Sequence, residues 1–117
     1  MKQARNHLAG LAAENSVLQT YLAAGYDLLA QRFRGLRGEI DLVLGRGARV
    51  VFVEVKKSRS FDAALARLGP AQIGRIFQTA SEYLATLPNG QMTETRFDVA
   101  LVNARGEISV IENALWQ

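Results

Sequence analysis

The strongest constraint on the fold is a pair of neighbouring segments with strand character, residues 39–44 and 49–56. Residues 50–55 read Val-Val-Phe-Val-Glu-Val, and β-branched and aromatic residues are favoured in strands. The glycine-containing stretch 45–47 is typical of a turn. We therefore expect an antiparallel hairpin. Side chains alternate between the faces of a strand, so the first segment is predicted to present Ile40, Leu42 and Leu44 on one face and Glu39, Asp41 and Val43 on the other.

The rest of the chain predicts helices and further strands around this hairpin. Helices are expected over 5–24, from leucines at helical spacing, and over 70–87, where Pro70 suits a helix start. The leucines are Leu8, Leu11, Leu18 and Leu22. Strands are expected at 26–33, 96–102 and 107–111, and a loop that can hold a short helical turn at 57–69. The order α-β-β-β-α-β-β indicates a single α/β domain, 1–117, with a mixed sheet flanked by helices.

Composition excludes several kinds of site. The chain has no cysteine, which rules out disulfides, thiolate zinc sites and thiol catalysis. His7 is the only histidine, so histidine-based zinc sites and triads are not supported, and we expect it on a helix surface. No apolar run reaches the about 18 residues that a membrane helix needs. We expect a cytoplasmic protein that does not enter a membrane.

The basic residues are concentrated in one part of the sequence. The net charge is +3, and eight of the 14 lysines and arginines lie between residues 32 and 59, where only three acids occur. Such a basic field is typical of proteins that bind nucleic-acid phosphates. The candidate phosphate-binding residues are Arg32, Arg34, Arg37, Arg46, Lys57 and Arg59.

Two carboxylates and an amine are predicted to converge on the hairpin. Glu54 and Lys56 are two residues apart in a strand and therefore share a face. Counting out from the turn places Asp41 opposite Glu54, and facing like charges destabilise a sheet. A shared divalent cation would remove this repulsion, and Mg²⁺ binds one or two carboxylates together with water and phosphate oxygens. Lys56 could also neutralise the pair without a metal.

The segments 38–42 (Gly-Glu-Ile-Asp-Leu) and 51–56 (Val-Phe-Val-Glu-Val-Lys) resemble the signature of the YraN family of bacterial proteins. The same family pattern is similar to Gly-Leu-Ala-Ala-Glu at 10–14, Arg-Phe-Asp-Val at 96–99 and Ile-Glu-Asn-Ala at 111–114. The Asp and Glu-x-Lys elements are also similar to the PD-(D/E)XK nucleases, including archaeal-type Holliday-junction resolvases. This resemblance implies a restriction-endonuclease-like α-β-β-β-α-β core and hydrolysis of DNA phosphodiester bonds.

The resemblance also implies roles for individual residues. Asp41 and Glu54 would ligate Mg²⁺ or Mn²⁺, with the Val55 carbonyl as a further ligand. Lys56 would orient or deprotonate the attacking water and stabilise developing charge. Glu14 matches the helical acid that often completes such sites, although a solvated helix glutamate is an equally good interpretation.

Three departures from the family pattern leave other functions open. Arg32 stands where asparagine is usual, Gln72 where lysine is usual, and Lys56-Lys57-Ser58 where Lys-Thr-Arg is common. A non-catalytic nucleic-acid-binding module of the same fold is therefore an alternative to the nuclease. A protein–protein module is a third hypothesis, in which two-fold symmetry would suit a homodimer on a two-stranded substrate.

Overall fold

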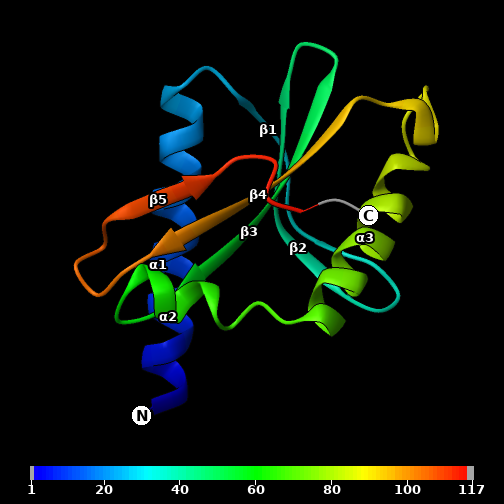
Figure 1. The fold of residues 1–117 in the computed structure, drawn as a ribbon. Coiled ribbons are helices and arrows are strands. Elements are labelled where there is room, and N and C mark those ends of the chain that lie inside the picture. The colour runs from blue at the N-terminus through cyan, green and yellow to red at the C-terminus, as the bar shows by residue number, and fades with distance from the viewer. Residues whose placement is uncertain (1, 116–117) are drawn as a thin grey trace.

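The computed structural model describes residues 2–115, and describes side chains from residue 8 onward. The side chain of His7 therefore lies outside the described residues. The chain (Figure 1) forms, in order, α1 (Lys2–Ala23), β1 (Asp27–Arg34), β2 (Glu39–Arg46), β3 (Arg49–Lys57), α2 (Phe61–Leu65), α3 (Pro70–Leu84), a short 3₁₀ helix (Gly90–Met92), β4 (Thr95–Val102) and β5 (Ile108–Ile111). None of the helices in this part of the chain combines the length and apolarity needed to cross a membrane.

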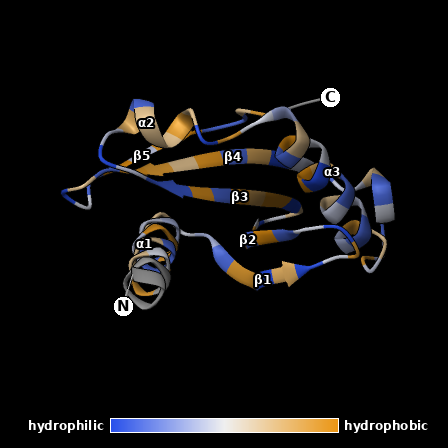
Figure 2. Ribbon diagram, turned by 90° about the horizontal axis from the view of Figure 1, so that it is seen from below, coloured by the Kyte–Doolittle hydropathy of each residue, from blue (hydrophilic) through white to orange (hydrophobic). Residues whose placement is uncertain are grey.

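The five strands form one mixed sheet in the order β1-β2-β3-β4-β5. Neighbouring strands are antiparallel except β3 and β4, which are parallel and are connected through α2 and α3. Figure 2 shows α1 on one side of the sheet and α2 on the other. The predicted α/β class with a mixed sheet flanked by helices is confirmed and is consistent with a restriction-endonuclease-like core.

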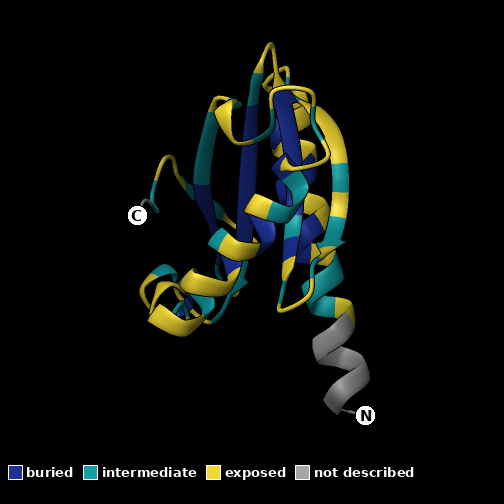
Figure 3. Cartoon of the chain, turned by 90° about the vertical axis from the view of Figure 1, so that its right-hand side faces the viewer, coloured by how far each residue is buried: buried dark blue, intermediate teal, exposed yellow. Residues whose placement is uncertain are grey.

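The predicted hairpin is formed by β2 and β3. Their antiparallel register runs from Arg46 opposite Arg49 at the turn to Leu42 opposite Val53. Gly47 in the turn has a φ of +60°, a conformation that glycine adopts without steric cost. The strands at the centre of the sheet are buried along most of their length (Figure 3), so the hairpin holds its register through its apolar faces.

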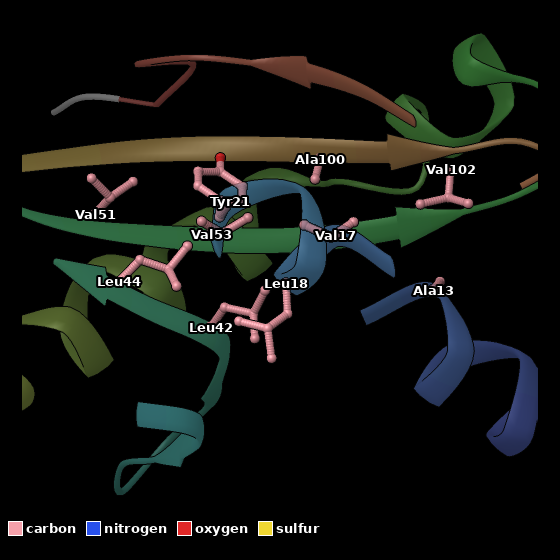
Figure 4. Packing of buried hydrophobic residues seen from close by; sticks show 10 residues of the cluster. All are labelled: Ala13, Val17, Leu18, Tyr21, Leu42, Leu44, Val51, Val53, Ala100 and Val102. Atoms are coloured by element: carbon pink, nitrogen blue, oxygen red, sulfur yellow. The ribbon is translucent and has the colours of Figure 1, made fainter. Parts of the chain in front are cut away.

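The core between α1 and the sheet is formed mostly by residues other than the leucines that predicted the helix. Val17, Leu18 and Tyr21 are buried against β-strand residues such as Leu42 and Val53 (Figure 4). The helix predicted from the leucine spacing is present, but of the four leucines only Leu18 is buried, and Leu8 is 63% exposed. The smaller side chains of Ala13 and Val17 are buried instead.

The opposite face of the sheet packs against α3 through a second cluster. Ile40, Val43 and Phe52 contact Ala80 and Leu84 of α3. Ile40 was predicted to share a face with Leu42 and Leu44, and this prediction was wrong. The alternation of side chains breaks at Asp41. Its β1 neighbour Arg32 has a φ of +54°, which interrupts the regular pleat at this point.

Asp98 in β4 is the centre of a buried polar network. Its carboxylate accepts hydrogen bonds from the Arg96 guanidinium (both 2.9 Å) and from the Tyr21 hydroxyl of α1 (2.7 Å). It also accepts one from the backbone N–H of Asn113 (2.9 Å). Burial, followed by the hydrogen bond to Asp98, raises the pKa of Tyr21 well above its usual range. One carboxylate thus joins α1, β4 and the segment after β5.

Candidate functional site

Asp41 lies where the pairing of β2 with β3 ends. The last paired residues are Leu42 and Val53. One residue further along, the Asp41 Oδ2 accepts a hydrogen bond of 2.8 Å from the Val55 N–H. The side chain of Asp41 therefore reaches across to β3. It accepts a hydrogen bond from a backbone N–H at the point where the backbone pairing of β2 with β3 ends.

Glu54 is the buried acid of the site, with 6% of its surface exposed. Its Oε2 receives a hydrogen bond of 2.6 Å from Gln72 Nε2 and lies 3.3 Å from the Lys56 ammonium. Its Oε1 is buried and has no hydrogen-bond partner. Because a buried polar atom without a partner is costly, this oxygen is stabilised either by a proton shared with Asp41, a hydrogen bond that adds to the effect of burial in raising the pKa of Glu54, or by a bound cation.

The two carboxylates perturb each other. Burial, followed by the negative charge of Asp41, raises the pKa of Glu54 from 4.5 to about 8, while Lys56 acts in the opposite direction. Burial is also the largest cause that raises the pKa of Asp41, and the charge of Glu14 adds to it. Asp41, Glu54 and Lys56 are thus brought together, as the hairpin counting predicted.

The donor set of this pair suits a hard divalent cation. Two carboxylates with an unpartnered buried oxygen match the way Mg²⁺ binds, with the remaining ligands being water and substrate oxygens. Within residues 2–115, no group of three or more histidines or acids is arranged to hold a metal ion. Val55, whose carbonyl was implied as a ligand, lies between Glu54 and Lys56 in β3 and binds Asp41 through its N–H.

Glu14 is buried in α1 and is paired with Arg32 of β1. Arg32 donates from Nε and Nη2 to the two carboxylate oxygens of Glu14, at 3.1 and 2.8 Å. These hydrogen bonds are the largest cause that raises the pKa of Arg32. Arg32 therefore pairs with Glu14 although its own side chain is 36% exposed, and Glu14 adds to the effect of burial in raising the pKa of Asp41.

The left-handed backbone at Arg32 yields a prediction about stability. Asparagine adopts a positive φ more readily than other non-glycine residues, so the φ of +54° at this position suits the asparagine that is usual in the family pattern. Arg32→Asn and Arg32→Ala both remove the ion pair with Glu14. Urea unfolding is expected to show Arg32→Asn as the more stable variant by about 0.5–1 kcal/mol. Equal stabilities would show that the backbone conformation at this position costs nothing.

The other predicted phosphate-binding residues are spread over the molecule. Arg34 is exposed and forms an ion pair with Glu39 at 3.2 Å. Arg37 is exposed in the β1–β2 loop, at the same end of the sheet as Asp41. Arg46 lies at the hairpin turn, five residues along β2 from Asp41 and therefore about 17 Å away, where its guanidinium is 5.2 Å from the centre of the Tyr26 ring.

A pocket of about 640 Å³ opens between α1 and the end of β3; Lys56, the ion-pair partner of Glu54, lines it, whereas Asp41 and Glu54 do not. The predicted residues Glu14, Val55, Lys56, Lys57 and Arg59 line it. It is also lined by Ala9, Gly10, Ala13, Ser58, Arg67 and Ala104. The structure thus gathers the predicted catalytic lysine and two of the predicted phosphate-binding residues around one opening.

Sequence reasoning missed two residues of the site. Gln72, noted only as a departure from the family pattern, donates to Glu54 Oε2 from the first turn of α3. Arg67 lines the pocket and donates from Nη1 to the Lys57 carbonyl at 2.6 Å. Neither contact follows from strand counting, because both depend on the path of residues 58–69. The only sequence signal for a role of Gln72 was its position near a helix start, where the family pattern has lysine.

Comparisons with known proteins identify the family of the chain. The model of the family described as "Uncharacterised protein family UPF0102" matches residues 13–102. The UPF0102 protein of Ruegeria pomeroyi is 54% identical over 110 residues, covering 94% of this chain and 89% of the relative. That of Roseobacter denitrificans is 55% identical over 107 residues, covering 92% and 83%. A Cereibacter sphaeroides relative is 51% identical over 109 residues, covering 93% of each. The chain therefore belongs to the UPF0102 (YraN) family.

Proposed function

We propose that this protein is a metal-dependent nuclease that hydrolyses phosphodiester bonds in DNA. The observation that carries the proposal is the buried Glu54 Oε1, which has no partner and belongs to a carboxylate coupled to Asp41. A Mg²⁺ or Mn²⁺ ion held by Asp41 and Glu54, with the Val55 carbonyl as a further ligand, would satisfy this oxygen and neutralise both acids.

The chain's own residues have separate tasks in this reaction. A divalent ion held by Asp41 and Glu54 would supply polarisation of the scissile phosphate and a lowered pKa of a water molecule. Gln72 and Lys56 both hold Glu54 Oε2, which leaves Oε1 to face the ion. The Lys56 ammonium orients the attacking water and stabilises negative charge as the water oxygen bonds to phosphorus and the leaving oxygen departs. Glu14, although paired with Arg32, lies close enough to Asp41 to add to the effect of burial in raising the pKa of Asp41.

The basic surroundings support nucleic acid as the substrate. Lys57 and Arg59 stand beside Lys56 in the pocket, and Arg37 is at the same end of the sheet. Contacts of lysine and arginine with backbone phosphates supply affinity without selecting a sequence. We therefore expect recognition of nucleic-acid shape, such as branches, flaps or ends. A cytoplasmic location is part of the same proposal.

A cleavage assay tests the proposal. The purified protein is incubated with labelled single-stranded, duplex and branched DNA, and with RNA, in Mg²⁺, Mn²⁺ or EDTA. We expect cutting that needs the metal and that falls at least about hundredfold in Asp41→Ala and Lys56→Ala. Asp27→Ala is the matched control, because Asp27 is exposed and pairs with Gly45 at the other end of the sheet. Metal-dependent cutting that survives in both site variants would refute the assignment.

The pairing of Glu14 with Arg32 favours one alternative, a nucleic-acid-binding module without catalysis. The resemblance implied Glu14 as the acid that completes a catalytic site, but its charge is paired with Arg32. Only Asp41 and Glu54 then remain as carboxylate ligands for a metal. The same experiment separates the two functions. Binding that weakens with salt, persists in EDTA and is never followed by cutting would identify the module.

A further inference from the structure

We propose that the pocket between α1 and β3, which Lys56 connects to the acid pair, binds one nucleotide of a single polynucleotide strand. The inference rests on the proposed function for the class of ligand, a nucleic acid, but it does not require cleavage. It assigns a place to the strand and a preference for single-stranded or frayed regions over an intact duplex.

The charge of the pocket fits a phosphate. Lys57, Arg59 and Arg67 line it, and among residues 8–115 none of the three has an acidic side chain within ion-pair distance. The two other charged groups of the lining, Glu14 and Lys56, are already paired with Arg32 and Glu54. Three cations without acidic partners on one side of the opening therefore attract an anion there.

A hydrogen bond holds one of these cations, Arg67, in place. Arg67 donates from Nη1 to the Lys57 carbonyl at 2.6 Å, which fixes the guanidinium against the end of β3. Arginine presents five donors, so its remaining N–H groups can bind phosphate oxygens while this contact stays intact. Arg59 is exposed and follows two residues after Lys57, which brings a second guanidinium to the same edge.

The wall of the pocket formed by α1 suits a sugar or a base. It includes the small residues Ala9, Gly10 and Ala13. These side chains contribute no charge and little bulk, so a flat, uncharged group can lie against the helix. A cationic edge and an apolar wall in one pocket correspond to the two parts of a nucleotide.

The volume of the pocket suits one nucleotide of a single strand and not a duplex. About 640 Å³ lies within the range of roughly 300–1,000 Å³ typical of pockets that enclose small molecules. A space of this size can take a nucleotide, whereas a duplex would have to remain outside it. A strand that enters must therefore be unpaired at that position, and unpaired nucleotides occur at ends, flaps and branches.

Gly10 offers a way to fill the pocket without touching the acid pair. It lines the pocket, and a Cβ added to it would meet no atom within 4 Å. Gly74 in α3 has equally open surroundings but is not part of the lining. Leucine is a better helix former than glycine by up to about 1 kcal/mol, so Gly10→Leu and its matched control Gly74→Leu should both fold.

Fluorescence anisotropy of labelled ten-nucleotide strands, measured in EDTA, tests the inference without cleavage. We expect single strands to bind more tightly than a blunt duplex of equal length. Gly10→Leu should weaken single-strand binding at least about fivefold and leave duplex binding unchanged, while Gly74→Leu stays within about twofold of the wild type. Arg59→Gln should weaken single-strand binding. It should also make the slope of log K against log salt concentration shallower by about 0.7, which is the value for one lost phosphate contact on a single strand.

The outcomes separate this inference from the nuclease proposal. Single-strand affinity that is the same in Gly10→Leu and Gly74→Leu overturns the pocket assignment, even if metal-dependent cutting is observed. A selective loss in Gly10→Leu supports it, even if no cutting occurs and the nuclease proposal fails. Parallel measurements with DNA and RNA strands of the same sequence show which sugar the pocket accepts.

Discussion

Replacing Asp98 with alanine is expected to lower the free energy of unfolding by about 3–5 kcal/mol, the usual loss when one partner of a buried ion pair is removed. The Asp98 side chain is fully buried and the Arg96 side chain is 12% exposed. The substitution would leave the Arg96 guanidinium, the Tyr21 hydroxyl and the Asn113 N–H without their common acceptor. Urea unfolding followed by circular dichroism measures the loss.

Two control variants test whether the loss of stability in Asp98→Ala comes from the buried hydrogen bonds of Asp98. Tyr21→Phe removes a single donor and should cost only about 0.5–1.5 kcal/mol. Asp27→Ala replaces an exposed aspartate and should change stability by less than about 0.5 kcal/mol. If Asp98→Ala cost no more than Asp27→Ala, the buried carboxylate would not be holding α1 and the chain end to β4.

Replacing Glu54 with glutamine is expected to remove most of a pH dependence of stability in the metal-free protein. The pKa of Glu54 is raised to about 8 in the folded protein, from 4.5. Between these pH values the folded chain keeps a proton that the unfolded chain has released, so wild-type stability falls as the pH rises from about 4.5 to about 8. Glutamine stays neutral, so Glu54→Gln should be more stable than wild type at pH 9 by a few kcal/mol.

Thermal unfolding in EDTA between pH 4 and pH 9 measures this difference. The surface variant Glu94→Gln serves as the control, because Glu94 is exposed and pairs only with Arg49 among the described residues. Addition of Mg²⁺ at pH 8–9 should raise the melting temperature of the wild type and of this control, and have little effect on Glu54→Gln. A parallel pH profile for Glu54→Gln and the wild type would contradict the raised pKa.

The sheet and the central part of the site could be predicted because they depend on local periodicity. The β-branched run 50–55 and the short turn determine the hairpin, and an antiparallel hairpin determines which residues face each other. This was sufficient to bring Asp41 to Glu54. The predicted helix over 70–87 was also confirmed, although it ends at Leu84.

The remaining features depend on contacts that periodicity does not encode. The buried face of α1 is set by which small side chains allow close packing, so Ala13 and Val17 outweigh exposed leucines. The break at Asp41 depends on the φ of its neighbour Arg32, which hydrophobic alternation does not reveal. The contact between Gln72 and Glu54 depends on how residues 58–69 bring α3 back over the sheet.

The irregular outline of the sheet affects how copies of the chain can associate. β1 forms one edge, and its register with β2 shifts between Leu28 and Ala30 before the left-handed residue Arg32. β5 forms the other edge and is only four residues long. Bulges and short outer strands deny a partner a straight row of amide and carbonyl groups. Continuation of the sheet into a second molecule is therefore disfavoured at both margins, which protects a chain rich in valine strands from fibrous aggregation.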